Sequence, residues 1–343
     1  MLEEREDPKR AEKPPEKGPP EGESPESVAG GGSLLRVAGA VKSYRALRAL
    51  GGVDLDLGTG EWVGLVGPNG AGKTTLFRGL VGLLRFDAGT IEVAGQRLTR
   101  ATAPRLRQHI GLVPQEIALY PALTARENLA LFGQLHGCRP GELGVRIAWA
   151  LEWTGLASRA DHAAGEFSIG MQRRLNIACG ILHRPQLLLL DEPTVGVDPQ
   201  GRQRIWAMLE EVRDQGATIL QSSHQLDEIQ RACDRMVILD HGRVVAAGSM
   251  DDLVATTAIG ARRLRAVLDR PPGEAGLDLG DLAAAGLKLE GREVVGIVEE
   301  VESQLPSLFE AIRRQGLTIE HLEVGAPRLE EIFIRLTGTE LRE

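Results

Sequence analysis

Apolar residues fall into short runs from Leu34 onward, separated by glycine and other turn residues. The runs "LLRVAGAV" and "GGVDLDL" have the length and composition typical of strands. They are followed by "EWVGLVG", which leads directly into "PNGAGKTTLFRGLVGLL". The pattern therefore predicts a strand, a glycine-rich loop and a helix in that order.

Between about residues 116 and 183 the apolar positions recur mostly with helical spacing, and no strong strand is predicted. The run "PQLLLLDEP" is continuously apolar and bounded by prolines, which is typical of a strand buried on both faces of a parallel sheet. "GATILQSSH" and "RMVILDHGRVVAAG" add further strands, and Gly242 stands where a hairpin turn is expected. The predicted fold class is α/β.

The pattern changes again near residue 255. The strand-like runs "RRLRAVLD" and "EVVGIVEE" precede a segment in which Leu305, Leu308 and Ile312 share one helical face and Gly316 suits the end of the helix. A strand "LTIEHLEV" and a last helix "RLEEIFIRLTG" complete a predicted small α+β domain over residues 255–343. It has no evident catalytic cluster.

The chain has 343 residues, more than one hydrophobic core usually holds, so two folded units are expected. Residues 1–33 are rich in Pro, Glu and Lys and poor in apolar residues, which predicts a disordered tail that is not a secretory signal. No run approaches the roughly 18 apolar residues of a membrane span, so the chain is not expected to cross a membrane itself.

Three separated cysteines, without CxxC spacing, argue against a disulfide framework or a zinc site and favour a reducing cytosol. The net charge of -8 is mild, and no basic stripe or aromatic-interleaved platform suggests a nucleic-acid partner.

The loop "GPNGAGKT" fits the spacing G-x-x-x-x-G-K-[ST], with Gly67, Gly72, Lys73 and Thr74 at the defining positions. Glycines let the loop curve around phosphates, Lys73 can reach the β- and γ-phosphates, and Thr74 can ligate Mg²⁺. The predicted nucleotide-contacting residues of this loop are Gly67, Asn69, Gly70, Gly72, Lys73, Thr74 and Thr75.

Asp191 and Glu192 end the apolar run "LLLLDEP". An Asp at the end of a buried strand can hold Mg²⁺, and an adjacent Glu can accept a proton from an attacking water. Such a pair is weak on its own, and the phosphate loop makes it a strong indication of nucleotide hydrolysis.

With these motifs the chain resembles the ATP-binding subunit of an ATP-binding cassette (ABC) transporter. Gln115 in "GLVPQE" matches the family's loop glutamine, which senses Mg²⁺ and the γ-phosphate. Asp198 in "TVGVDP" matches the loop that crosses the dimer interface, and His224 in "LQSSH" matches the switch histidine. Tyr44 in "KSYRAL" matches the aromatic residue that stacks on adenine.

The resemblance covers about residues 34–250 and implies a P-loop NTPase of ABC type, with a mixed sheet core and a helical subdomain near residues 116–183. It implies catalytic roles for Glu192, His224 and Gln115, with ATP and Mg²⁺ bound. Thr74, Gln115 and Asp191 are the implied metal-binding residues.

The family's LSGGQ-type loop is represented here by "FSIGM", residues 167–171, followed by the basic pair Arg173 and Arg174. In the family this loop caps the ATP of the other subunit, and Ser168 and Gly170 keep its two phosphate-contacting groups. Ile169 replaces a glycine. In the first alternative, Ile169 is unfavourable, because a positive φ strains it or because its bulk holds the interface apart. In the second, it has an ordinary φ and points its side chain away from ATP. The first alternative predicts that Ile169→Gly raises ATP turnover.

The segment "ALYPALTARENLALFG" and the last helix resemble exporter cassettes whose permease is a separate chain, including drug and polysaccharide exporters. This implies a polytopic permease and a second cassette, as homodimer or heterodimer, at the cytoplasmic face of the membrane. Tyr120, Leu123 and Glu127 are the candidate permease contact. The alternatives are a soluble regulator of a cytosolic assembly and a weakly hydrolysing member of a heterodimeric pair.

Overall fold

The computed structural model describes residues 32–45, 47–257, 262–272 and 287–338. Most of the predicted disordered tail, residues 1–31, lies outside these ranges. Strand β1 (Ser33–Tyr44) begins one residue earlier than the predicted boundary.

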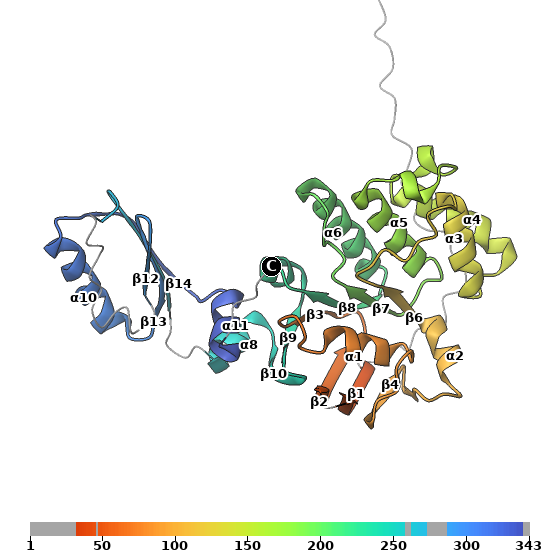
Figure 1. Ribbon diagram of the computed structural model, residues 1–343, viewed down its shortest axis with the longest axis horizontal. Coiled ribbons are helices and arrows are strands. Elements are labelled where there is room, and N and C mark those ends of the chain that lie inside the picture. The colour runs from red at the N-terminus through yellow and green to blue at the C-terminus, as the bar shows by residue number, and fades with distance from the viewer. Residues whose placement is uncertain (1–31, 46, 258–261, 273–286, 339–343) are drawn as a thin grey trace, which may run out of the picture.

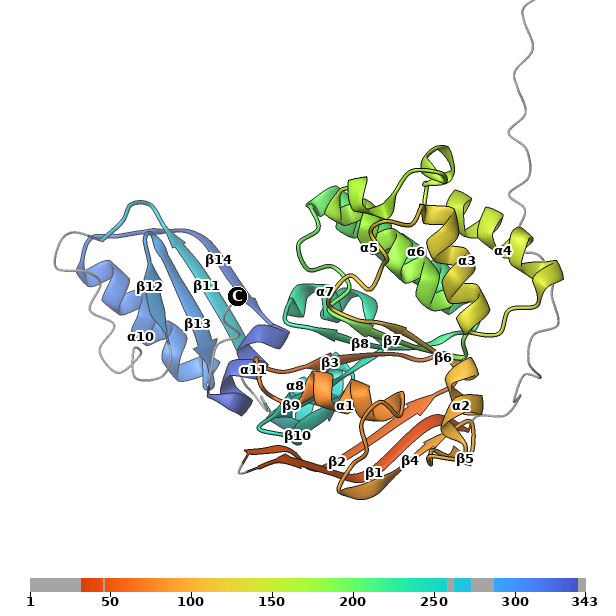
Figure 2. The same ribbon diagram turned by 45° about the vertical axis from the view of Figure 1, so that its right-hand side comes forward.

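Two sheets form the first folded unit, with helix α1 (Lys73–Leu80) between them (Figures 1 and 2). The smaller sheet is antiparallel, with the strand order β2-β1-β4-β5. Its other strands are β2 (Leu47–Gly58), β4 (Ala88–Val93) and β5 (Gln96–Arg97). The sequence pattern missed β4, which contains a glycine, and β5, which has only two residues.

The larger sheet has the order β10-β9-β3-β8-β7-β6 and positions the site. Strands β9, β3, β8, β7 and β6 run parallel, and β10 pairs antiparallel with β9 through the hairpin expected at Gly242. Its strands are β3 (Trp62–Val66), β6 (Ile110–Val113), β7 (Leu187–Asp191), β8 (Thr218–Ser223), β9 (Arg235–Asp240) and β10 (Arg243–Gly248). Every residue of β3, β7 and β8 is buried, as the apolar runs predict for a central parallel sheet.

Helices cover the face of the large sheet opposite α1 (Figure 2). They are α3 (Ala125–Leu135), α4 (Pro140–Trp153), α5 (Ile169–Ile181) and α6 (Pro199–Asp214), and the short α2 (Ala103–Leu106) precedes β6. The first three occupy the region predicted to be helical. Helix α3 begins with a capping box, in which Thr124 Oγ1 accepts from the Glu127 N–H and Glu127 Oε2 accepts from the Thr124 N–H.

The C-terminal residues form a third sheet with its own core (Figure 1). Its strands, in the antiparallel order β12-β13-β11-β14, are β11 (Arg262–Leu268), β12 (Lys288–Glu290), β13 (Glu293–Val298) and β14 (Ile319–Gly325). Helix α10 (Val301–Arg314) buries Leu308 and Ile312 against the sheet with Leu305 partly buried, which confirms the predicted face. Gly316 has φ 66° just beyond the helix end.

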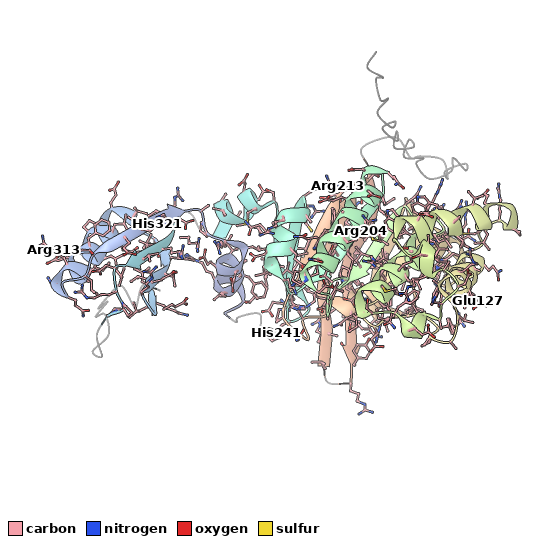
Figure 3. The ribbon with its side chains drawn as sticks, turned by 90° about the horizontal axis from the view of Figure 1, so that it is seen from above. Glu127, Arg204, Arg213, His241, Arg313 and His321 are labelled. Atoms are coloured by element: carbon pink, nitrogen blue, oxygen red, sulfur yellow. The ribbon has the colours of Figure 1, made fainter. Side chains whose placement is uncertain are left out.

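Helix α11 (Leu329–Thr337) differs from the expectation that it completes the small unit. Its buried residues Leu329, Ile332 and Phe333 pack with residues of α7 (Leu226–Ala232) and α8 (Met250–Thr257), and with strands of the large sheet. The apolar face of α11 packs against the first unit because α7 and α8 leave an apolar surface there. Figure 3 shows this connection between the C-terminal unit, which carries His321 and Arg313, and the first unit, which carries Glu127 at its far end.

Candidate functional site

The glycine loop between β3 and α1 passes close to other backbone segments. A Cβ on Gly67 would lie 2.2 Å from the Leu239 carbonyl oxygen, so a side chain is excluded there. Gly72 has φ 111°, a conformation that side chains rarely allow, and a Cβ would lie 2.5 Å from the Ala49 oxygen. These two glycines therefore fix the curve of the loop that begins α1.

Lys73 is buried, and its Nζ donates to the carbonyl oxygens of Gly67 and Pro68 within the loop. Burial lowers the pKa of Lys73, and the negative charges of Glu192 and Asp191 act in the opposite direction. The ammonium group thus bonds the loop carbonyls and also interacts electrostatically with both carboxylates.

Asp191 is held at the end of β7 by two hydroxyl groups. Thr74 Oγ1 donates to Asp191 Oδ2 at 3.1 Å, and Ser222 Oγ donates to Asp191 Oδ1 at 2.6 Å. The same Ser222 Oγ accepts a hydrogen bond from the Glu192 N–H at 3.0 Å. The Ser222 hydroxyl therefore holds both members of the carboxylate pair. It bonds the side chain of Asp191 and the backbone N–H of Glu192.

Glu192 is 7% exposed and has φ 49°, an uncommon conformation for a residue with a side chain. Its Oε2 accepts from Gln115 Nε2 at 3.1 Å and lies 3.2 Å from His224 Nδ1. The predicted residues Gln115 and His224, from separate parts of the chain, thus both contact one carboxylate oxygen of the third predicted residue, Glu192. Positive φ values of this kind gather at functional sites, where surrounding contacts hold the strain.

The oxygen ligands at this site suit a magnesium ion. The Thr74 hydroxyl and the Asp191 carboxylate lie within hydrogen-bond distance of each other, and Gln115 contributes an amide to the same site. Mg²⁺ usually binds one or two carboxylates of the protein and keeps its other coordination positions for water and phosphate oxygens. Among the described residues no cluster of three or more His, Cys, Asp or Glu could hold a metal ion.

Ser168, Gly170 and Asp198 form a second group at the beginnings of α5 and α6. Ser168 caps α5 by accepting from the Met171 N–H, and Asp198 caps α6 by accepting from the Gly201 N–H. A Cβ on Gly170 would lie 3.8 Å from Asp198 Oδ1. Within the described residues, no hydrogen bond or ion pair joins this group to the loop at Gly67–Thr75.

Ile169 is the first residue of α5 and is not among the described non-glycine residues with positive φ. The strain hypothesis for Ile169 is therefore wrong, because the position takes an ordinary conformation that any residue adopts. Its side chain is 55% exposed, and one methyl group lies 3.7 Å from the place of a Cβ on Gly196.

Tyr44 lies at the end of β1, 42% exposed, with Lys42 Nζ 5.7 Å from its ring centre. Among the described residues, no hydrogen bond or ring contact joins Tyr44 to the glycine loop, so its place in the site stays a prediction. Asn69 and Gly70 are exposed within the loop and Thr75 is half-buried in the first turn of α1.

Several residues of the site were missed from the sequence. Ser222 gives no signal within an apolar strand, and Arg173 was noticed only as half of a basic pair. Asn128 of α3 is fully buried and bonds both the N–H and the carbonyl of Tyr120. A buried Asn in a helix could have been suspected only from its place on the apolar face of α3.

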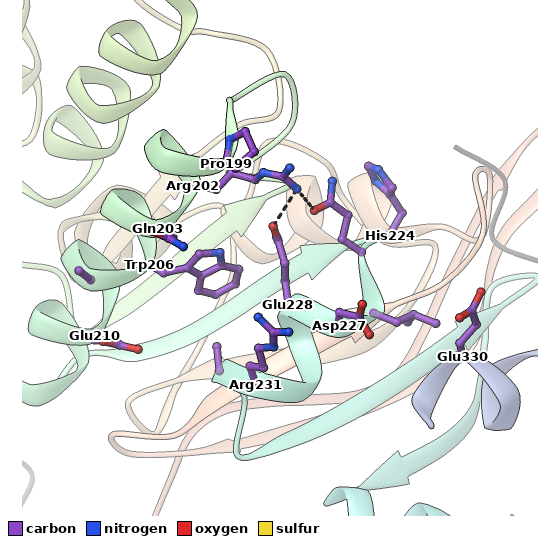
Figure 4. Close-up of a pocket in the computed structure, with 14 residues that line it drawn as sticks. Pro199, Arg202, Gln203, Trp206, Glu210, His224, Asp227, Glu228, Arg231 and Glu330 are labelled. Carbon is purple, nitrogen blue, oxygen red and sulfur yellow. Dashed lines mark hydrogen bonds and ion pairs between the residues drawn. The ribbon is translucent and has the colours of Figure 1, made fainter. Parts of the chain in front are cut away.

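A pocket of about 740 Å³ lies between α6 and α7, beside His224 (Figure 4). Trp206 and Arg202 face it from α6, and Glu228 and Arg231 from α7, with Glu330 of α11 at one side. Glu228 bonds Thr194 Oγ1 at 2.8 Å and lies 3.5 Å from Arg202. The glycine loop does not contribute to its lining, so we distinguish it from the nucleotide site.

Comparison with known proteins agrees with this geometry. Residues 50–195 match the sequence model of the family described as ABC transporter. The chain is 37% identical to a linearmycin resistance ATP-binding protein of Bacillus subtilis, over 90% of this chain and all of the relative. It is 39% identical to a daunorubicin resistance ATP-binding protein of Streptomyces coeruleorubidus, over 90% of this chain and 98% of the relative.

Solved structures match the first folded unit. An ATP-binding subunit of an ABC transporter has a TM-score of 0.60 at 35% identity, covering 65% of this chain and 92% of its own. A cassette dimer bound to ADP and phosphate has a TM-score of 0.58 at 26% identity, covering 63% and 99%. The predicted resemblance and fold class are confirmed.

Proposed function

This chain belongs to the ATP-binding subunits of ABC transporters, and from that premise we propose the roles of its individual residues and partners. Its relatives include ATP-binding proteins of drug resistance and Nod factor export. The chain binds and hydrolyses ATP as the cassette of an exporter. The observation that carries the residue assignment is the convergence of Gln115 and His224 on Glu192, next to the glycine loop.

Glu192 is the proposed general base. Gln115 and His224 both contact Oε2, and among the residues that the structure describes no hydrogen bond reaches Oε1. A water bonded to Oε1 could pass a proton to the carboxylate as its oxygen attacks the γ-phosphorus, while the bond from that phosphorus to the β–γ bridging oxygen breaks and ADP leaves. His224 and Gln115 orient the carboxylate, and Lys73 places a positive charge in the curve of the loop.

Thr74 and Asp191, with Gln115, would hold magnesium bound to the phosphates, and the metal would neutralise charge that develops during phosphoryl transfer. The Ser222 hydroxyl keeps the Asp191 carboxylate and the Glu192 backbone in one fixed arrangement. The chain therefore provides a rigid carboxylate pair that does not need to reorganise as the reaction proceeds.

Ser168 and Gly170 are proposed to contact the ATP of a second cassette, with Asp198 beside them at the same interface. The arrangement supports this because the helix α5 begins at these residues, and its N–H groups favour an anion. The solved cassette dimer bound to ADP and phosphate supports assembly in pairs.

The proposed permease contact is the segment that carries Tyr120, Leu123 and Glu127. Tyr120 is 53% exposed and is fixed at its backbone by Asn128. One oxygen of the Glu127 carboxylate, Oε2, accepts the capping hydrogen bond from the Thr124 N–H. The other oxygen could contact a permease while that bond is kept. No helix among the described residues is long and apolar enough to span a bilayer. We propose that the chain is held at the cytoplasmic membrane face by a separate polytopic permease.

The test is the Glu192→Gln variant, purified with Mg-ATP from gently solubilised membranes. Loss of a general base commonly lowers a rate by about 10² to 10⁴, so this variant should retain ATP and trap a closed pair of cassettes. Mass spectrometry should identify a polytopic permease with it. Soluble partners alone would instead favour a cytosolic regulator, and hydrolysis at the wild-type rate would exclude Glu192 as the base.

A further inference from the structure

Arg173 is a buried arginine of helix α5 that does not contact the carboxylates directly. Its side chain is 3% exposed. Nη1 donates to the Pro114 carbonyl at 3.0 Å, and Nη2 donates to the Gln115 carbonyl at 2.7 Å. A guanidinium group in this environment loses most of its hydration, and its burial lowers the pKa of Arg173 while the charge of Glu192 opposes that shift.

The contact continues one helical turn later. Asn176, three residues after Arg173 and on the same face of α5, accepts from the Ala118 N–H at 3.3 Å. Further along the same helix, Gly180 packs so closely on β6 that its carbonyl oxygen would lie 2.3 Å from a Cβ on Gly111. Helix α5 is therefore attached to β6 and to the loop after it along most of its length.

The residue that Arg173 holds is also the one that reaches the proposed base. Gln115 offers its backbone carbonyl to Arg173 and its side-chain amide to Glu192 Oε2. The same helix begins just after Ser168, little more than one turn before Arg173, in the loop proposed to contact the partner's nucleotide. One helix thus connects the part of the chain that faces the second cassette with the part that faces its own carboxylate pair.

We propose that Arg173 is a positioning residue, which fastens Gln115 to helix α5 so that the helix position sets the reach of the Gln115 amide to Glu192. Binding of the partner's nucleotide at the start of α5 would then adjust hydrolysis at the cassette's own site. This rests on the proposed roles of Glu192 and Ser168. The link is a contiguous set of hydrogen bonds, and its energetic coupling is measurable.

A double-mutant cycle with Arg173→Met and Gln115→Ala tests the coupling. In the full chain with its permease, we expect Arg173→Met to lower kcat about 10- to 100-fold, because two hydrogen bonds from a charged donor are lost. Nucleotide affinity, measured with a fluorescent ATP analogue, should change by less than about twofold. In the Gln115→Ala background, where the amide is already gone, Arg173→Met should lower kcat by less than about twofold further.

Two further variants separate positioning from general damage. Arg173→Lys keeps the charge and one donor, so it should recover part of the lost kcat. Arg204→Met is the control for the loss of an arginine that donates to a backbone carbonyl, because Arg204 Nη2 donates to the carbonyl of Trp153, away from Gln115. We expect Arg204→Met to leave kcat within about twofold of wild type.

Independent, multiplicative effects of the two substitutions would overturn the proposal. So would a variant in which kcat, nucleotide affinity and melting temperature all fall together and Arg173→Lys recovers none of them. These results differ from a failure of the proposed function, which would appear as wild-type hydrolysis by Glu192→Gln.

Discussion

The hydroxyl of Ser222 provides the sharpest prediction about the carboxylate pair. Ser222 is completely buried, donates to Asp191 Oδ1 at 2.6 Å and accepts from the Glu192 N–H at 3.0 Å. Ser222→Ala removes both hydrogen bonds without changing the size of the strand residue greatly. The substitution therefore tests whether a rigid carboxylate pair is needed for hydrolysis.

The magnitude follows from the two bonds. A hydrogen bond to a charged group contributes about 1.5 to 3 kcal/mol, and one between neutral groups about 0.5 to 1.5 kcal/mol. The second loss is reduced, because the Glu192 N–H also reaches the Ser222 carbonyl at 3.2 Å. The total is about 2 to 4 kcal/mol, equivalent to about 30- to 700-fold in rate if all of it affected the transition state.

Part of that energy will instead appear as lost folding stability. We therefore expect kcat for ATP hydrolysis to fall at least about tenfold, with a lower melting temperature measured on the same preparation. Ser223→Ala is the matched control, because its hydroxyl bonds only near Gln225 and does not touch either carboxylate. A Ser222→Ala protein with kcat within twofold of the control would refute the reasoning.

Three other outcomes are expected. Phe333→Ala should lower the free energy of unfolding by about 3 to 5 kcal/mol in a denaturant titration, since this fully buried ring joins α11 to α7 and α8; a loss below 1 kcal/mol would contradict that packing. Ile169→Gly should lower stability by about 0.5 to 1 kcal/mol, because glycine disfavours a helix position that is already unstrained; a thermal melt showing stabilisation would contradict the ordinary φ. Burial lowers the pKa of His183 to about 3, below its unfolded value, so the folded state binds fewer protons and stability should fall as pH drops from about 6.5 towards 3, by at most about 1.4 kcal/mol per pH unit from this residue. His183→Leu should flatten that pH dependence in urea titrations, and an unchanged slope would exclude His183 as its source.

The sequence predicted those parts of the site whose residue types are tied to a local pattern. Asp191 and Glu192 end a run of four leucines, and Lys73 stands at a fixed distance from Gly67, so strand, loop and carboxylates could be placed in order. The fold class followed from the same alternation of strands and helices. The strand β6 was missed because its four residues are too short for a periodicity to emerge.

Other features depend on distant contacts that no local pattern records. The φ of Ile169 is set by its place at the start of α5, and residue type alone suggested strain that is not there. Arg173 became informative only when its guanidinium was found on the Gln115 carbonyl, 58 positions away. The helix α11 has a clear apolar stripe, but the stripe does not say which of two cores it joins.

The packing of α11 has a consequence for the order in which the chain matures. During synthesis the first unit emerges well before residues 329–337, and domains generally fold in that order. The apolar surface of α7 and α8 is therefore exposed until the C-terminal sheet has been synthesised and α11 can pack on it. Since α7 directly follows His224, the switch region of the site is the last part of the first unit to gain its full support. Until α11 has been synthesised, we therefore expect the segment that follows His224 to lack part of its packing.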